Sequence, residues 1–152
     1  MIAKRGSRRG TTLMTEIVLL VFRVNGRLLS AGDRLVGDLG LTSARWQMLG
    51  AVALSDHPRT APQLAARMGM TRQAAQKQLD LLKEDGLVAA EVNPGHARSP
   101  LYVLTRKGTS LYASTERVQT AWANRLAESL SIRDLETTKQ LLDTLSTRLN
   151  LS

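Results

Sequence analysis

The residues with the most distinctive chemistry lie in residues 70–88, MTRQAAQKQLDLLKEDGLV. All its basic and side-chain amide residues except Lys83 come early in this stretch, among them Arg72, Gln73, Gln76 and Lys77, whereas its acidic residues all come late. Arginine and lysine can pair with guanine O6 and N7, and glutamine can pair with adenine N6 and N7. The free backbone amides at the start of a helix attract phosphate. We therefore expect the early half to contact the bases and phosphates of a nucleic acid.

Helical spacing places these side chains on one shared face. At 100° per residue from Arg72, the polar residues up to position 84, except Gln78, fall within a sector of about 140°. Acidic residues near the carboxyl end of a helix oppose its dipole, so helix stability alone does not explain their order. The opposite face is apolar and carries Ala74, Ala75, Leu79, Leu81 and Leu82. A solvated polar face on an ordinary surface helix is the alternative interpretation.

The distribution of charge favours a polyanionic partner. The net charge is +8, and residues 59–107 hold eight basic and four acidic residues, while residues 1–10 hold four basic residues and no acid. The remaining segments are neutral. This pattern favours nucleic acid over a membrane surface, with general solubility as the alternative explanation. Residues 1–10 are predicted to be a disordered basic tail, with or without a role as an arm that contacts DNA.

Other classes of function find little support in the sequence. The absence of cysteine excludes disulfides, thiolate metal sites and thiol oxidation. His57 and His96 stand far apart, and no glycine-rich phosphate loop or cluster of carboxylates and histidines occurs. Asp56 beside His57 is better explained as a pair of exposed polar groups than as a metal site. We expect no enzymatic activity, no cofactor and no metal. No apolar window reaches the ~18 residues of a membrane span, which predicts a cytoplasmic protein.

The elements that must position the polar face follow from capping residues and glycines. Apolar spacing predicts a long helix from Thr11 or Thr12 to about residue 31, and a second helix capped by Ser43. Thr60 is expected to cap a third helix that stops at Gly69. Thr71 then caps the polar-faced helix, so the two helices are joined by a short turn, as in a helix-turn-helix.

The pattern changes to a strand pattern after this helix and then returns to helix. LVAAEV and PLYVLT flank NPGHARS, which predicts a two-stranded hairpin with an exposed tip at residues 93–99. Helical spacing resumes after Gly108, and a last helix is expected to begin at Ser131 or Asp134. We predict a mainly α fold with a small β-hairpin wing, forming a single domain over residues 11–152. A winged helix-turn-helix spans residues 42–104, flanked by terminal helices at 11–38 and 105–152.

In this order and spacing, three segments resemble the MarR family of bacterial transcription regulators. They are LGLTSARWQML, APQLAARMGMTRQAAQKQLDLLKEDGLV and YVLTRKG, and the resemblance covers roughly residues 11–150. It implies a homodimer whose terminal helices interlock and whose two winged domains bind a near-palindromic site on double-stranded DNA. The leucine-rich, neutral terminal helices independently favour a dimer. The resemblance also implies a repressor that responds to a ligand.

The resemblance assigns roles to individual residues. Candidate DNA-binding residues are Thr60, Thr71, Arg72, Gln73, Gln76, Lys77 and the wing arginine, Arg98. Family members often carry an acid two residues before that arginine, and this chain has His96 there. A small aromatic or anionic effector is implied between the dimerisation helices and the winged domain. The candidate residues that would bind it are Asn25, Arg45 and Trp46. Each of these three is also interpretable as a core or surface residue, and Trp46 and Trp122 fit core positions.

Two alternatives concern the partner rather than the fold. A winged helix can serve as a protein-protein interaction module without sequence-specific DNA binding, which an acidic recognition face would favour; here the early face is basic. RNA is the other option, but a helix reads the wide major groove of DNA better than the narrow major groove of RNA.

Overall fold

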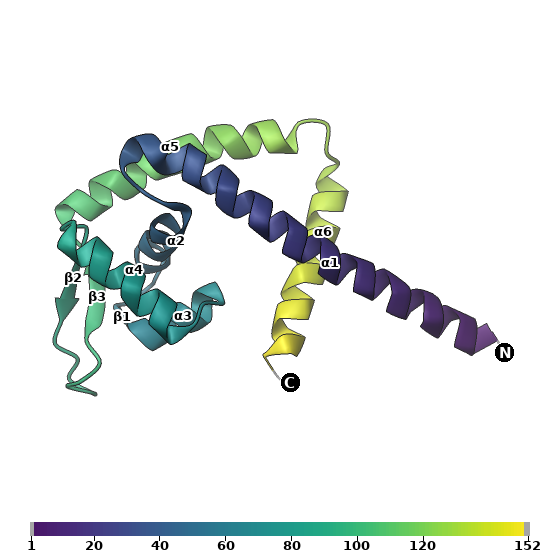
Figure 1. Cartoon of the computed structure of the whole chain (residues 1–152), viewed down its shortest axis with the longest axis horizontal. Helices are drawn as coiled ribbons and strands as arrows, with labels where there is room; N and C mark the ends of the chain where they lie inside the picture. Colours follow the sequence, from purple (N-terminus) through teal and green to yellow (C-terminus); the bar gives the residue numbers. More distant parts are fainter. Residues whose placement is uncertain (1, 151–152) are drawn as a thin grey trace. The chain divides into compact units, whose positions relative to one another are not determined.

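The computed structural model describes the backbone of residues 2–150 and the side chains of residues 8–150. It is mainly helical with one small sheet, as predicted (Figure 1). The sequence predicts a single domain over residues 11–152. In the structure, residues up to 118 form one compact unit and residues from 119 onwards form a second, because each set makes most of its contacts internally.

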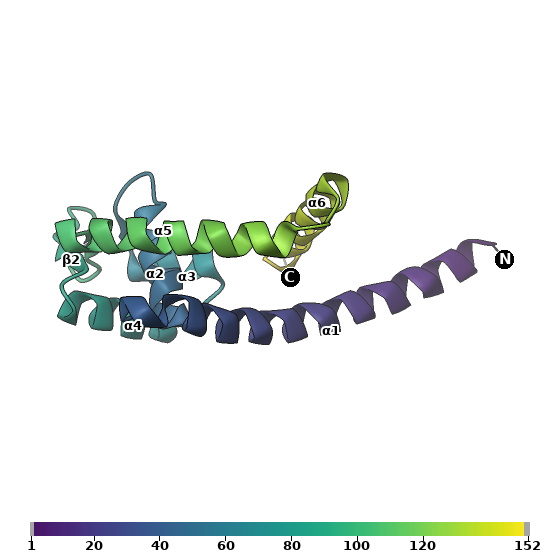
Figure 2. The same cartoon turned by 90° about the horizontal axis from the view of Figure 1, so that it is seen from above.

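The first helix is longer than predicted. Helix α1 runs from Ile2 to Val36, so the expected caps at Thr11 and Thr12 are wrong and the disordered tail at residues 1–10 is not seen. Met1 lies outside the described residues. Extending an existing helix costs far less than nucleating one, which explains why it continues through Gly6 and Gly10. Only the carboxyl-terminal part of α1 lies against the rest of its unit (Figures 1 and 2).

A 3-10 helix and three short α-helices after α1 build the body of the first unit. The 3-10 helix η1 (Gly37–Leu39) leads into α2 (Ser43–Ala53), then α3 (Ala61–Met68) and α4 (Arg72–Glu84) follow. Thr42, not Ser43, caps α2: its Oγ1 accepts a hydrogen bond from Arg45 N at 3.3 Å. Ser43 N instead donates to Asp33 Oδ1 at 2.7 Å, which ties α2 to α1. The core is aliphatic, and its largest fully buried side chains include Met48, Leu49, Leu64, Leu79 and Leu82.

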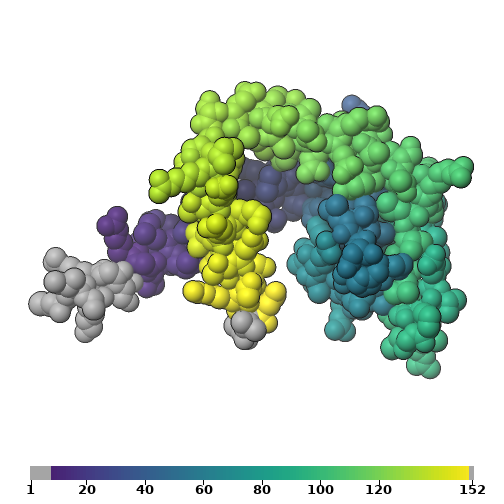
Figure 3. All heavy atoms as spheres, turned by 180° about the vertical axis from the view of Figure 1, so that it is seen from behind, coloured from purple at the N-terminus to yellow at the C-terminus, as the bar shows by residue number. Residues whose placement is uncertain are grey.

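The sheet has one strand more than the predicted hairpin. Strands β2 (Val88–Glu91) and β3 (Leu101–Leu104) form that hairpin, and β1 (Arg59–Thr60) adds to the other side of β3. All pairs are antiparallel, with Tyr102 between Arg59 and Ala90. Strand β1 is only two residues long, which is too short for a strand pattern to appear in the sequence. The hairpin loop projects from the helices, as Figure 3 shows in the green part of the space-filling view.

Two further helices complete the chain. Helix α5 spans Arg106–Ala127 and begins two residues before Gly108, the point from which helical spacing was expected. Gly108 is buried, and a Cβ there would lie 1.9 Å from Leu87 O, so only glycine allows this approach. Helix α6 spans Ile132–Leu149, with Ser131 Oγ accepting from Asp134 N at 3.3 Å as the predicted cap. Within residues 2–150, no helix has the length and apolar character needed to cross a membrane.

Candidate nucleic-acid interface

Helix α4 and the turn before it have the predicted geometry. Gly69 ends α3 with φ of 62°, a left-handed conformation that favours glycine. Thr71 then caps α4, its Oγ1 accepting a hydrogen bond from Ala74 N at 3.1 Å. Ala75, Leu79 and Leu82 are buried against the core, so the register of the helix is fixed. The remaining face of α4 is therefore held outward, with its amino end following a tight turn.

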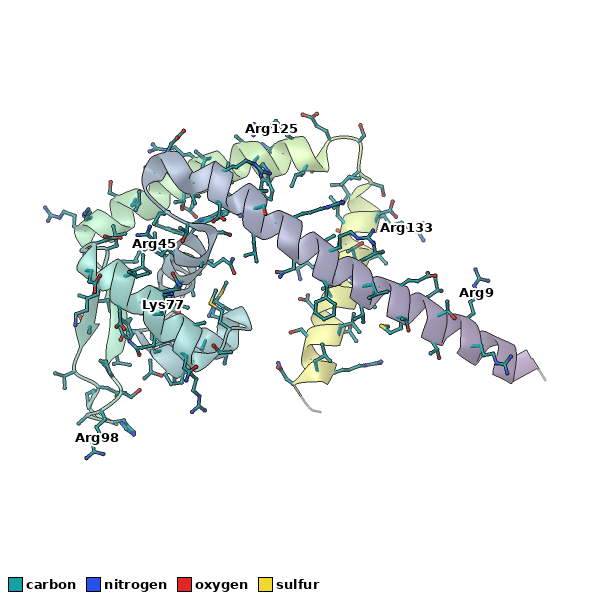
Figure 4. The ribbon with its side chains drawn as sticks, viewed as in Figure 1. Arg9, Arg45, Lys77, Arg98, Arg125 and Arg133 are labelled. Atoms are coloured by element: carbon teal, nitrogen blue, oxygen red, sulfur yellow. The ribbon has the colours of Figure 1, made fainter. Side chains whose placement is uncertain are left out.

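The amino end of α4 exposes most of the predicted DNA-binding side chains. Thr71, Arg72, Gln73 and Lys77 are all exposed, and Figure 4 places Lys77 on α4. The Arg72 guanidinium, the Gln73 carboxamide and the Lys77 ammonium thus lie toward the end of the helix where its dipole and free amides already favour anions. Asp80, Glu84 and Asp85 follow toward the other end of the helix. Most of the exposed donors of this face therefore lie toward the amino end, with Lys83 as an exposed donor in the last turn.

Gln76 differs from its neighbours because its amide is already bonded within the protein. Its Nε2 donates to Asp80 Oδ1 at 2.9 Å, one helical turn away, and to the hydroxyl of Tyr102 at 3.0 Å. Gln76 is half-buried, and Tyr102 is buried in β3. Sequence reasoning placed Gln76 with the free donors and missed both partners. The structure instead uses its amide to join the polar face of α4 to the sheet.

The tip of the wing is organised by an asparagine. Asn93 Nδ2 donates to Ser99 O at 2.9 Å, and Gly95 N donates to Asn93 Oδ1 at 3.0 Å. This side chain braces the loop from inside, beside the exposed His96. Arg98 is exposed, and Figure 4 shows its side chain directed away from the sheet at the far end of the loop. The segment NPGHARS predicted an exposed hairpin tip here, but not the hydrogen bonds of Asn93 that hold it.

Thr60 lies at the junction of β1 and α3. It is half-buried, its N donates to Gln63 Oε1 at 3.0 Å, and it pairs with Leu101 of β3. Arg59 beside it donates to Asp56 Oδ1 at 2.7 Å. The hydrogen bond from Arg59 lowers the pKa of the Asp56 carboxyl, and the nearby His57 lowers it further. Asp56 therefore serves as an anchor for the start of β1 rather than as half of a free metal-binding pair.

A hollow of about 860 Å³ lies in the first unit, at the opposite end of α4 from Arg72. Arg45, Arg106 and Lys107 line it together with Asp85, the residue that ends α4. Arg45 Nη1 lies 2.7 Å from Asp85 Oδ2, and Lys107 Nζ donates to Asp85 O at 2.7 Å. Two cations from α2 and α5 thus hold the end of α4. Leu39, Leu87 and Leu111 add an apolar lining to this basic hollow.

The three predicted effector residues do not come together. Arg45 lines the hollow, but Asn25 and Trp46 do not. Asn25 is exposed on α1, where no helix spacing could distinguish a ligand from a surface amide. Trp46 packs on the core, and its ring lies 3.5 Å from where a Cβ on Gly32 would be. Arg45 and Trp46 therefore face different surroundings within this unit, and the assignment of the three residues to an effector site stays a prediction.

Comparison with known proteins agrees with this geometry. The family model described as MarR family matches residues 39–99, which contain the helix-turn-helix and most of the wing. An uncharacterised protein of Mycobacterium tuberculosis is 39% identical over 130 residues, covering 85% of this chain and 89% of the relative. A relative from Mycobacterium bovis matches to the same extent.

Solved structures share the fold over nearly the whole chain. The crystal structure of a MarR family transcription regulator superposes with a TM-score of 0.77 at 25% identity, covering 93% of both chains. CouR from Rhodococcus jostii RHA1, bound to p-coumaroyl-CoA, gives a TM-score of 0.76 at 23% identity, covering 86% of this chain and 91% of CouR. CouR bound to a 23-mer DNA duplex gives 0.73 at 24% identity, covering 84% and 89%. At these identities the CouR matches establish the fold.

Proposed function

The chain belongs to the MarR family of transcription regulators, and we propose that it is a repressor that binds a near-palindromic site on double-stranded DNA as a homodimer. The observation that carries the proposal is the exposed end of α4. Arg72, Gln73 and Lys77 stand free there, on a helix whose other face is locked into the core. A helix held in this way can enter the major groove by its amino end.

The wing supplies the second contact in this proposal. Arg98 extends from a loop that Asn93 holds in shape, so little ordering is needed when it meets DNA. Arginine inserts favourably into a narrow minor groove, where the negative potential is strongest. With α4 in the major groove, the hairpin is the part of this unit that can reach the adjacent minor groove.

Exposed apolar side chains support the dimer. On α1, Leu19 is 60% exposed and Phe22 is 71% exposed, and Leu130, Ile132 and Leu149 are exposed at or near α6. Apolar exposure on this scale marks an interaction surface rather than a solvated one. A second copy of the chain is the partner that the family proposal requires. Two copies would present two α4 helices to one face of the DNA.

The basic hollow supports a ligand response. An anionic or aromatic ligand entering it would meet Arg45, Arg106 and Lys107. It would compete with Asp85 for Arg45 and Lys107. We propose that such a ligand loosens the end of α4 and so changes DNA affinity. That CouR has been solved with p-coumaroyl-CoA supports a ligand with an aromatic group and negative charge.

A matched pair of arginine variants tests the DNA proposal. Arg72→Ala should weaken binding to the preferred DNA site by about 1 to 3 kcal/mol, because a base-reading arginine is lost. Arg34→Ala removes the same charge from the exposed last turn of α1 and should change affinity much less. Fluorescence anisotropy with a labelled duplex, at several salt concentrations, measures both. Equal losses from the two variants would reduce α4 to a source of general charge and contradict the proposal.

A further inference from the structure

The position of the Gln76 amide has a consequence for base recognition. An ionised aspartate can only accept hydrogen bonds, so the NH₂ group of Gln76, and not its carbonyl oxygen, must face Asp80. The second hydrogen of the same NH₂ group points to the Tyr102 hydroxyl. Both donors of this side chain are therefore engaged inside the protein. Its Oε1 has no hydrogen-bond donor among residues 8–150 and is not among the buried atoms without a partner.

The Tyr102 hydroxyl is a fixed point for this arrangement. Tyr102 is only 5% exposed and sits in the central strand β3, paired with Arg59 on one side and Ala90 on the other. The ring cannot move without disturbing the sheet. The Gln76–Asp80 bond spans one helical turn, a spacing that favours such pairs. The Gln76 side chain is thus held at two points, and the orientation of its carboxamide is set before DNA binds.

We propose that Tyr102 and Asp80 fix Gln76 so that it offers only its carbonyl oxygen to DNA, which makes Gln76 a reader of amino-bearing bases. This inference rests on the proposed DNA-binding function. A free glutamine pairs with adenine by accepting from N6 and donating to N7. Gln76 lacks the free donor, so it accepts from adenine N6 or cytosine N4. Guanine O6 and N7 and thymine O4 are all acceptors and are disfavoured at this position.

In this account Tyr102 and Asp80 are positioning residues for base recognition. Tyr102 acts through Gln76 from beneath the helix, and the exposed Asp80 carboxylate is itself a further acceptor on the same face. Arg72, Gln73 and Lys77 remain free donors around them. The α4 surface thus presents acceptors at Gln76 and Asp80 beside donors at Arg72, Gln73 and Lys77.

Atomic substitution in the DNA tests the inference on the full-length protein. Comparing sites selected from random DNA by the wild type and by Gln76→Ala identifies the base pair that Gln76 reads. At that pair, adenine is replaced by purine, which lacks the N6 amino group, or by 7-deazaadenine, which lacks N7. For the wild type, we expect loss of the amino group to weaken binding about three- to tenfold, as for one hydrogen bond. Loss of N7 should change affinity less than about twofold.

Variants that release the carboxamide should reverse this insensitivity to N7. In Tyr102→Phe combined with Asp80→Ala, the NH₂ group is free to donate to N7. The 7-deazaadenine substitution should then weaken binding about threefold or more. The readout is the ratio of the affinities for the adenine and the 7-deazaadenine DNA. A ratio is needed because removing the Asp80 charge raises affinity for every sequence. Tyr112→Phe removes the other phenolic hydroxyl of the chain, on α5, and should leave the ratio unchanged. Circular dichroism establishes that each variant is folded.

Several results would overturn the inference. They are a wild type that depends on N7 as strongly as on the amino group, or a Gln76→Ala variant with unchanged base preference. A released variant that stays insensitive to N7 while folded would also contradict it. These results all leave sequence-selective binding intact. A wild-type protein that selects no sequence would instead contradict the proposed function on which the inference depends.

Discussion

At the scale of single residues, the positions that sequence can predict are those whose role is local. Thr71, Gly69 and Ser131 have the predicted caps and turns, because a cap depends on residues within one helical turn. Gln76 was predicted as a free donor. The prediction failed because its bond to Tyr102 joins residues 26 positions apart in the sequence. That contact depends on the register of β3 against α4, which no spacing within the helix reveals.

Gly108 gives a prediction for stability at this scale. Gly108→Ala places a Cβ 1.9 Å from Leu87 O, a backbone atom that cannot move without disturbing the start of β2. We expect a loss of about 3 kcal/mol or more in the free energy of unfolding, or failure to fold. Urea unfolding followed by circular dichroism measures it.

Gly50 provides the matched control for this substitution. A Cβ on Gly50 in α2 would lie 3.7 Å from Tyr112 Cε2, an ordinary contact. Gly50→Ala should leave stability unchanged or raise it by up to about 1 kcal/mol, because alanine is the better helix former. Equal stability of the Gly108→Ala variant and the wild type would contradict the close approach of α5 and β2.

At the scale of elements, α4 is free at one end and held at the other. Its amino end exposes donors, while Arg45 and Lys107 hold the carboxylate and the carbonyl of Asp85 at its carboxyl end. Cations near the carboxyl end of a helix interact favourably with its dipole. Arg45 and Lys107 therefore offset the unfavourable effect of the acidic residues at this end. The order of helices and hairpin followed from the sequence. The strand β1, the early start of α1 and this clamp did not, since they depend on tertiary contacts or on helix extension.

The clamp predicts a measurable coupling between Arg45 and Asp85. In a double-mutant cycle with Arg45→Gln and Asp85→Asn, we expect a coupling energy of about 0.5 to 1 kcal/mol in urea unfolding. The pair is partly exposed, with side chains 22% and 44% accessible, so the value should fall as salt is added. The same cycle with Arg106→Gln, which lines the hollow without an ion pair to Asp85, should give nearly zero. Equal coupling in both cycles would mean that the charge of the hollow, not the ion pair, holds α4.

At the scale of the whole molecule, the proposed function depends on a dimer. The +8 charge gives general attraction to DNA, but sequence selectivity requires two α4 helices held at a fixed spacing. The exposed apolar residues of α1 were predictable from helical spacing. Sequence could not distinguish those facing the core from those left open, because both sets follow the same period.

Sedimentation tests the dimer with paired variants. The wild type should sediment at about twice 16.6 kDa at micromolar concentration. Replacing Leu19 and Phe22 together by glutamine should weaken the dimer by about 3 kcal/mol or more, since each large apolar side chain buried contributes about 1.5 to 3 kcal/mol. Leu54→Gln changes an equally exposed leucine after α2 and should leave the dimer intact. A monomeric wild type would contradict the assembly.

The most direct test of the central claim is the selection of bound fragments from a random pool of double-stranded DNA, read by sequencing. We predict one enriched motif with two inverted half-sites whose centres lie about 34 Å apart, one turn of the duplex, or a multiple of it. The Arg72→Ala variant should lose preference at one base pair in each half-site. A pool that shows no enriched sequence, or a single half-site without a symmetric partner, would contradict sequence-specific binding by a dimer through α4.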